Sequence, residues 1–282
     1  MISKVNFTIV DVFTDTPFEG NQLGVFTDAR RLSSAQMQTL AKELRFSECA
    51  FVLPAERDGH ARVRIFTPSE ELSFAGHPVL GTAFVLASPM QLGVINLETA
   101  SGTIPVILER DGTAISFGRM SQPHAHVEPY DRVGGLLVAL GVKRSVLPVE
   151  TYRNGPLHIM VALSRAEEVA GLSPDMVRLA AVVGDACVSC FAQDGTKVKS
   201  RMFAPGMGVE EDPATGSAAG PLALHLSRHE AIRWGDEIEI SQGAEIGRPS
   251  KLLARATGGD AELGIMEVGG SARLVARGEF II

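Results

Sequence analysis

The sequence predicts an α+β fold of two similar half-domains, each with a mostly antiparallel sheet and few helices. Three observations predict it. The 282 residues are enough for about two domains. Strand-like segments of alternating or continuous apolar residues outnumber the helical segments along the chain. A strand–loop–glycine–helix pattern occurs twice, and the copies lie about half the chain apart.

Composition excludes several classes of protein. Lysine and arginine number 26 against 33 acidic residues, which gives a formal net charge of −7, and no basic cluster is present. Nucleic-acid binding depends on neutralising phosphates, so we expect no nucleic-acid partner. No stretch approaches the roughly 20 apolar residues of a membrane span, so we expect no membrane association either.

The clearest elements follow from local patterns. Residues 61–65 alternate apolar and charged side chains, which predicts a half-buried strand. Residues 33–44 are predicted to form a helix, because Ser33 and Gln36 have capping-box spacing and the apolar residues recur at helical intervals. A second helix is expected over 173–184, with Ser173 as N-cap and with Val177, Ala180 and Val183 on its buried face.

The internal repeat sets the domain organisation. Phe66-Thr67-Pro68 precedes a loop and an apolar helix that begins near Gly76, and Phe203-Ala204-Pro205 precedes a similar helix that begins near Gly216. Each helix carries a second glycine one turn on. We therefore expect half-domains at 1–125 and 126–282, with a linker around 122–130 and with the last strand free to return to the first half.

Glycines at two helix starts suggest the chemistry. A helix start offers free N–H groups and the positive end of the helix dipole, and glycine lets a ligand approach the backbone. Such a position binds anions, so Gly76 and Gly216 are candidate binding sites for a small carboxylate. The alternative is that both glycines only allow tight turns.

Few polar residues lie near these helix starts. His77 and Ser217 directly follow the two glycines, and Asp212 precedes the second helix. Glu48 stands at the mouth of an apolar strand, where desolvation raises a carboxyl pKa toward the range of a general acid/base. Taken alone, each of these residues also fits a structural role.

The three cysteines indicate a reducing compartment rather than a disulfide framework. Cys187 and Cys190 form a C-x-x-C pair, but their surroundings are typical of a buried strand, so we interpret both as core residues. No phosphate-binding loop, dinucleotide fingerprint or zinc-protease motif is found. We therefore expect no metal and no organic cofactor, and proton transfer by side chains is the chemistry that remains.

At these residues the sequence resembles the PhzF family of phenazine biosynthesis, which shares the diaminopimelate-epimerase fold. The resemblance covers essentially the whole chain. Its matching segments are Val10-Asp11-Val12-Phe13, Pro17-Phe18-Glu19-Gly20-Asn21, Phe46-Ser47-Glu48, Phe74-Ala75-Gly76-His77-Pro78 and Glu211–Pro221. Arg153-Asn154-Gly155-Pro156 with His158, and Glu245–Ser250, are similar to the phenazine-pathway members.

The resemblance implies an active site between two pseudo-symmetric halves, each a sheet rolled around a central helix. Glu48 matches the family's acid/base, and we expect His77 and Asp212 to be catalytic with it. The residues that match substrate contacts are Ser47, Gly76, Gly216 and Ser217. The sister epimerases use a cysteine at each helix start. Neither start carries a cysteine here, so two-thiol racemisation is excluded.

The expected function is therefore a cofactor-independent isomerase, in the cytoplasm and as a homodimer, that moves a proton between ring carbons of trans-2,3-dihydro-3-hydroxyanthranilate. Two alternatives remain. One is a related isomerase or epimerase acting on another small amino or hydroxy acid. The other is a non-catalytic protein that binds an anionic metabolite.

Overall fold

The computed structural model describes residues 4–259 and 262–282. The chain divides into two compact units. Residues 1–121 and 269–282 make up the first unit, and residues 122–268 the second. Among the described residues, no helix combines the length and apolar character needed to cross a bilayer.

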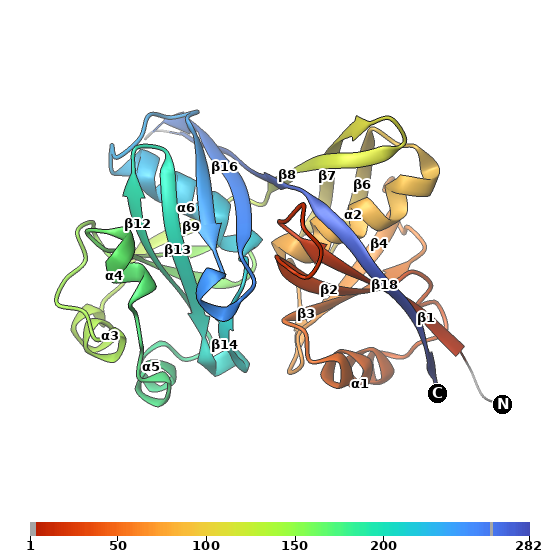
Figure 1. The fold of residues 1–282 in the computed structure, drawn as a ribbon, viewed down its shortest axis with the longest axis horizontal. Helices are drawn as coiled ribbons and strands as arrows, with labels where there is room; N and C mark the ends of the chain where they lie inside the picture. The colour runs from red at the N-terminus through yellow and green to blue at the C-terminus, as the bar shows by residue number, and fades with distance from the viewer. Residues whose placement is uncertain (1–3, 260–261) are drawn as a thin grey trace. The chain divides into compact units, whose positions relative to one another are not determined.

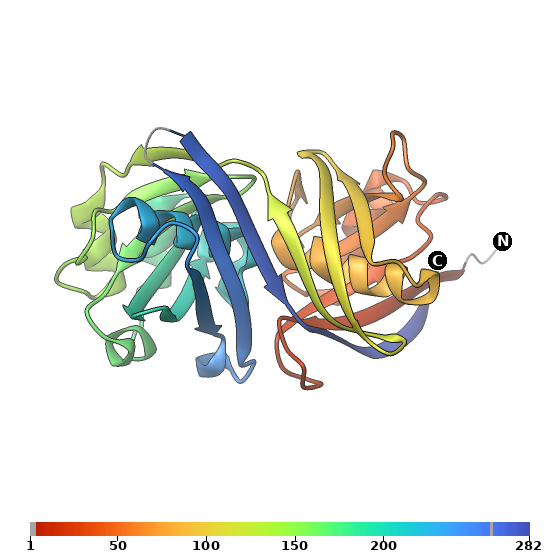
Figure 2. The ribbon, with the colours of Figure 1, turned by 90° about the horizontal axis from the view of Figure 1, so that it is seen from above.

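The first unit is a curved sheet around one buried helix (Figures 1 and 2). Its elements are β1 (Lys4–Val12), β2 (Asn21–Phe26), α1 (Ser34–Leu44), β3 (Glu48–Leu53), β4 (Ala61–Phe66), β5 (Glu71–Leu72), α2 (Gly76–Met90), β6 (Val94–Thr99), β7 (Gly102–Asp111), β8 (Ala114–Gln122) and β18 (Ala272–Ile281). The C-terminal strand β18 pairs with β1, so the last strand belongs to this unit (Figure 1).

The second unit repeats this plan. Its elements are β9 (His126–Pro129), α3 (Val133–Leu140), β10 (Glu150–Arg153), β11 (Leu157–Ala162), α4 (Ala166–Ala170), α5 (Met176–Val183), β12 (Cys187–Asp194), β13 (Lys197–Ala204), β14 (Val209–Asp212), α6 (Gly216–Arg228), β15 (Glu237–Gln242), β16 (Ser250–Gly259) and β17 (Glu262–Gly270).

Strand pairing confirms the internal repeat. In the first unit β2 lies parallel to β3, β3 antiparallel to β4, and β4 parallel to β6. In the second unit β11 lies parallel to β12, β12 antiparallel to β13, and β13 parallel to β15. Leu23 opposite Glu48 corresponds to His158 opposite Cys187. Cys187 therefore occupies in the second unit the place that Glu48 occupies in the first.

The cysteine interpretation holds. Cys187 and Cys190 lie in strand β12, both are buried, and all three cysteines of the chain are free. Burial raises the pKa of Cys190 to about 12, which leaves it without thiolate character at neutral pH. The pair is part of the core, as the sequence predicts.

The two central helices are buried over most of their surface, which explains why most of their residues are apolar or small. Their second glycines admit close packing. A Cβ on Gly81 would lie 2.6 Å from Leu23 Cδ2, and one on Gly220 would lie 2.1 Å from Gln122 Oε1. Gln122 is itself fixed, because its Nε2 donates to the Gly216 carbonyl at 2.8 Å.

Gly220→Ala should lower the free energy of unfolding by about 1–3 kcal/mol, because the added methyl displaces the fixed Gln122 amide. Gly134→Ala is the matched control. It lies in α3 with no heavy atom within 4 Å of the added Cβ, and the change should stabilise the protein by about 0.5–1 kcal/mol. Urea unfolding of both variants measures the difference. Equal effects of the two substitutions would contradict the packing argument.

The two predicted helices agree with the structure to different degrees. The helix over 34–44 has Ser33 as N-cap and a complete capping box with Gln36, as predicted. The second helix begins at Met176 rather than near Ser173, because the Asp175 carboxylate accepts the Arg178 N–H at 3.0 Å. Leu179 and Val183 form the buried face of this helix, whereas the predicted Val177 is 84% exposed.

The expected linker is wrong in part. Residues 126–129 form β9, which pairs antiparallel with β10, and the Thr151 hydroxyl donates to the Glu128 carbonyl at 3.1 Å. Only residues 123–125 connect β8 to β9 without strand structure, and Pro129 ends the paired strand β9.

A buried carboxylate organises the loop between β3 and β4. Glu98 accepts backbone N–H groups from Glu56 at 2.7 Å, Arg57 at 2.8 Å and Gly59 at 2.9 Å. These bonds favour the charged form and hold the pKa of Glu98 below its ordinary value. A depressed carboxyl pKa contributes stability above the unfolded-state pKa, and that contribution is lost as the pH falls.

Glu98→Gln should therefore destabilise the protein at neutral pH, and its deficit should shrink as the pH falls below about 4.5. Thermal unfolding midpoints of both proteins across this range measure the effect. A deficit that stays constant with pH would show that the charge of Glu98 contributes nothing.

Candidate active site

Glu48 and His77 meet at one end of the first unit. Glu48 is the first residue of β3 and His77 the second residue of α2. The Glu48 Oε2 lies 3.5 Å from His77 Nε2, and the two side chains are 16% and 3% exposed. A carboxylate this far removed from water, beside an imidazole, can hold and release a proton without exchanging it at once with bulk solvent.

Asn21 sets the state of the histidine. At the start of β2 it is buried, and its Nδ2 lies 3.3 Å from His77 Nδ1. An amide that donates to Nδ1 requires that nitrogen to be unprotonated, so a neutral His77 carries its proton on Nε2, toward Glu48. The imidazole thus orients the carboxylate rather than competing for the proton that it takes up.

The residues on either side of Glu48 in the sequence complete the part of the site that lies in the first unit. Ser47 directly precedes it and is half-buried. Cys49 directly follows it in the core, and burial together with the Glu48 charge raises the Cys49 pKa to about 12. Cys49 is therefore an inert core residue, as the sequence suggests.

Asp212 is held in the second unit by two side chains. It ends β14 and is 4% exposed. The Thr215 hydroxyl donates to Asp212 Oδ2 at 2.6 Å. Gln242 Nε2 donates to the Asp212 carbonyl at 2.7 Å and to Thr215 Oγ1 at 3.0 Å. The aspartate is thereby fixed in one orientation just before α6.

Ser217 is equally constrained. It is the second residue of α6 and 5% exposed. Its Oγ lies 3.1 Å from His158 Nε2, and its carbonyl accepts from Asn154 Nδ2 at 3.0 Å. The serine therefore has contacts on both its side chain and its main chain.

Both helix starts are open to an anion. Neither N-cap residue, Ala75 of α2 or Thr215 of α6, caps its helix with its own side chain, and neither helix has an acidic residue in its first turn. The Thr215 N–H itself donates to Gln242 Oε1 at 3.4 Å. The free N–H groups at Gly76 and Gly216 can therefore bind a carboxylate. In the first unit the structure brings Glu48 and His77 together, and in the second it places Asp212, Gly216 and Ser217 around the start of α6.

Five residues of the site escaped the sequence analysis. Asn21, Asn154 and His158 lie in segments that carry the family resemblance but were given no role. Thr215 stands beside the predicted Gly216, also in a segment that carries the resemblance, and was likewise given no role. Gln242 gives no local signal, because it reaches Asp212 from 30 residues away.

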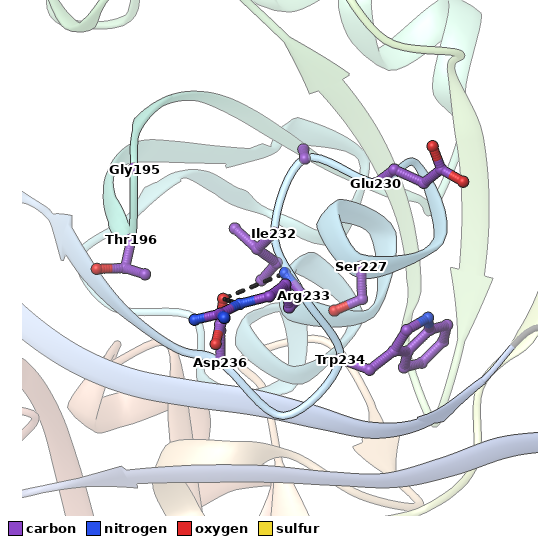
Figure 3. Close-up of a pocket in the computed structure, with 9 residues that line it drawn as sticks. Gly195, Thr196, Ser227, Glu230, Ile232, Arg233, Trp234 and Asp236 are labelled. Carbon is purple, nitrogen blue, oxygen red and sulfur yellow. Dashed lines mark hydrogen bonds and ion pairs between the residues drawn. The ribbon is translucent and has the colours of Figure 1, made fainter.

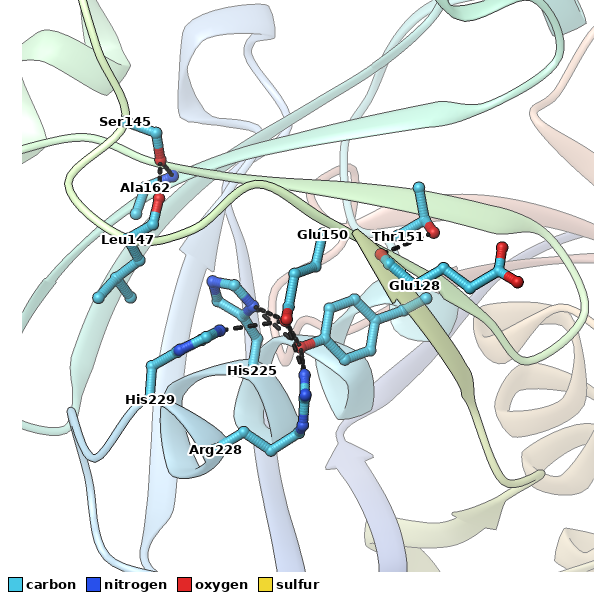
Figure 4. Close-up of polar contacts among 10 residues, drawn as sticks. Glu128, Ser145, Leu147, Glu150, Thr151, Ala162, His225, Arg228 and His229 are labelled. Atoms are coloured by element: carbon cyan, nitrogen blue, oxygen red, sulfur yellow. Dashed lines mark hydrogen bonds and ion pairs between the residues drawn. The ribbon is translucent and has the colours of Figure 1, made fainter. Parts of the chain in front are cut away.

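A second polar cluster lies near the other end of α6 (Figure 4). Glu150, His225 and His229 place their ligand atoms within 4.8 Å of one another. The i, i+4 spacing of His225 and His229 is visible in the sequence, but no role was predicted for it. Arg228 Nη1 already lies 2.7 Å from Glu150 Oε2, the oxygen that a metal would need. We therefore interpret the cluster as an ion-pair network that fastens α6 to β10.

A cavity of about 540 Å³ lies beside the same end of α6 (Figure 3). Its lining includes Ser227, Arg233, Trp234 and Asp236. None of the predicted site residues lines it. Ser217 begins α6 and Ser227 lies near its end, about 15 Å along the helix axis.

Comparison with known proteins decides the family. Residues 10–278 match the family model described as phenazine biosynthesis-like protein. The chain belongs to this PhzC-PhzF family. It is 46% identical to a Pseudomonas aeruginosa protein named trans-2,3-dihydro-3-hydroxyanthranilate isomerase, and the match covers 96% of this chain and 98% of the relative. This PhzC-PhzF family member is an isomerase.

Solved structures confirm the fold. A PhzF-family protein of Bacillus anthracis superimposes with a TM-score of 0.86 at 24% identity, over 99% of this chain and 100% of the other. A hydroxyproline epimerase from Agrobacterium vitis gives a TM-score of 0.68 at 12% identity, over 99% and 93%. The predicted α+β fold of two similar halves is therefore confirmed, and it is shared with epimerases.

Proposed function

We propose that this PhzC-PhzF family member isomerises trans-2,3-dihydro-3-hydroxyanthranilate, with Glu48 as the acid/base. The contact between Glu48 and His77 carries the proposal, since it provides a shielded carboxylate beside a buried imidazole whose Nδ1 faces the Asn21 amide. The 46% identity to a protein named for this reaction supports the choice of substrate.

In the proposed reaction the Glu48 carboxylate takes the proton from C3 of the ring and becomes a carboxylic acid. The ring double bonds shift, and Glu48 returns the proton to another ring carbon on the same face, so that it ends as a carboxylate again. This transfer gives an enol, and movement of the enol hydroxyl proton to a ring carbon then gives the aminoketone, an isomer of the substrate. General acid/base catalysis of this kind contributes about 10²–10⁴-fold to the rate.

The remaining residues bind the substrate in this proposal. The open helix starts at Gly76 and Gly216 bind its carboxylate. His77, Asp212 and Ser217 contact its polar substituents, and Ser47 lies beside Glu48. We propose that no cofactor takes part.

We also propose that the protein works as a homodimer in the cytoplasm. The family resemblance suggests the dimer, and three free cysteines fit a reducing compartment. Sedimentation equilibrium measures the mass of the assembly, and a monomer at every concentration would contradict the proposed homodimer.

A spectrophotometric assay with dihydro-hydroxyanthranilate tests the function directly. Catalysed conversion to the aminoketone is the expected result. Absence of turnover, together with turnover of a different amino or hydroxy acid, would favour the alternative isomerase. Binding of the compound without deuterium uptake from D₂O would identify a binding protein instead.

A further inference from the structure

His158 and Asn154 lie outside the residues expected to contact substrate, yet both contact Ser217. His158 is the second residue of β11 and fully buried, and Asn154 precedes the same strand and is 4% exposed. Buried polar side chains cost free energy unless their bonds are made, so their position here requires an explanation.

The Asn154 contact replaces a bond that α6 cannot make for itself. In an α-helix the carbonyl of Ser217 would accept the N–H of the residue four positions later, which is Pro221 and has no N–H. Asn154 Nδ2 donates to this carbonyl at 3.0 Å instead. The first turn of α6 therefore keeps its geometry despite the proline.

The His158 contact has a definite direction. Burial lowers the pKa of His158 to about 3, so the ring is neutral at physiological pH and carries one N–H. Within the described part of the chain, its Nδ1 is buried and has no hydrogen-bond partner. A buried N–H without a partner is rarer than an unpaired acceptor, so the proton belongs on Nε2.

An Nε2–H at 3.1 Å donates to Ser217 Oγ. A protonated Nε2 cannot accept a hydrogen bond, so the Ser217 hydroxyl can donate its own proton to a different group. We propose that His158 and Asn154 are positioning residues that fix Ser217 as a hydrogen-bond donor to an oxygen of the substrate. This inference rests on the proposed function, and it assigns the serine to the substrate's carboxylate or hydroxyl oxygen rather than to its protonated amine.

The tautomer can be measured without any assay of activity. In the full-length protein labelled with ¹⁵N-histidine, two-bond ¹H–¹⁵N correlations distinguish the two neutral forms, and His158→Gln identifies the signal. We expect Nε2 to be protonated and Nδ1 unprotonated, unchanged between about pH 5 and 8. A protonated Nδ1, or a ring that titrates in this range, would overturn the proposal whatever reaction the protein catalyses.

A double-mutant cycle tests the coupling to catalysis. Ser217→Ala and His158→Leu should each lower kcat/KM by about 3–10-fold, and the double variant should lose no more than the larger single loss. His158→Gln, which retains a donor, should recover part of the activity. His126→Leu, at an exposed histidine, is the control. When it is combined with Ser217→Ala, the fold losses in kcat/KM of the two single variants should multiply, as expected for independent sites. If the kcat/KM losses of His158→Leu and Ser217→Ala multiply in the double variant, the result would contradict the proposal.

Failure of the positioning proposal and failure of the proposed function can be distinguished by experiment. If His158→Leu does not fold, the His158→Gln variant and the tautomer of the unmodified protein still decide the question. If the protein does not turn over dihydro-hydroxyanthranilate but shows the expected tautomer, the proposed function fails and the direction of the Ser217 bond stands.

Discussion

Glu48→Gln lowers kcat for dihydro-hydroxyanthranilate by about 10²–10⁴-fold and leaves the fold intact. The amide keeps the size and polarity of the carboxyl group but cannot accept the C3 proton. His77 does not substitute for it, because Asn21 keeps the ring proton on Nε2 and the ring faces Glu48 rather than free space. Steady-state kinetics with an unfolding curve for each protein measure both effects.

Glu43→Gln is the matched control for this result. Glu43 lies on the exposed side of α1, only five residues before Glu48, so its substitution should change kcat less than twofold. Near wild-type turnover by Glu48→Gln would contradict the assignment of the acid/base. A large loss by both variants would point to a general effect of charge instead.

Arg201→Met lowers the free energy of unfolding by about 3–5 kcal/mol, the largest stability effect that we expect. Arg201 forms a two-pronged ion pair with Glu211, with Nε–Oε1 2.8 Å and Nη2–Oε2 2.7 Å, and both side chains are 9% exposed. Its Nη1 also donates to the carbonyls of Ala170 and Leu172. Removal of Arg201 leaves Glu211 buried without its partner.

Arg30→Met is the control for this prediction. Arg30 makes an equally close contact with Asp28, at 2.7 Å, but both side chains are more than half exposed. Its loss should cost less than about 1 kcal/mol, because solvent screens exposed pairs. Similar losses at the two sites in denaturant unfolding would mean that burial does not determine the strength of these pairs.

Glu211 also links this stability to the site. It directly precedes Asp212, and Arg201 joins it to the end of α4. We therefore expect the arrangement around Asp212 to depend on the buried pair, even though neither Arg201 nor Glu211 is proposed to contact the substrate.

The elements predicted correctly are those whose sequence motifs involve residues close together in the chain. The capping box at Ser33 lies within four residues, and the repeated glycines mark the two central helices because each is needed where helix and neighbouring side chains approach closely. The expected N-cap at Ser173 was wrong. The helix begins after Asp175, whose carboxylate accepts the Arg178 N–H.

Long-range contacts account for what could not be predicted. Gln242 reaches Asp212 and Gln122 reaches Gly216 across 30 and 94 residues, and neither residue stands in a motif. His158 carried a resemblance but no role, because its meaning depends on which atom faces Ser217. The isomerase activity followed from the family resemblance, whereas the groups that contact Glu48 and the two helix starts required the fold.

Transfer of a deuterium label from C3 of dihydro-hydroxyanthranilate tests the central claim most directly. With substrate deuterated at C3, the wild-type protein in H₂O should remove the label from C3 as the aminoketone forms, and Glu48→Gln should leave it in place. Nuclear magnetic resonance of the ring carbons follows the label. Consumption of the substrate with deuterium still at C3, or label loss at the wild-type rate in Glu48→Gln, would contradict proton transfer by Glu48.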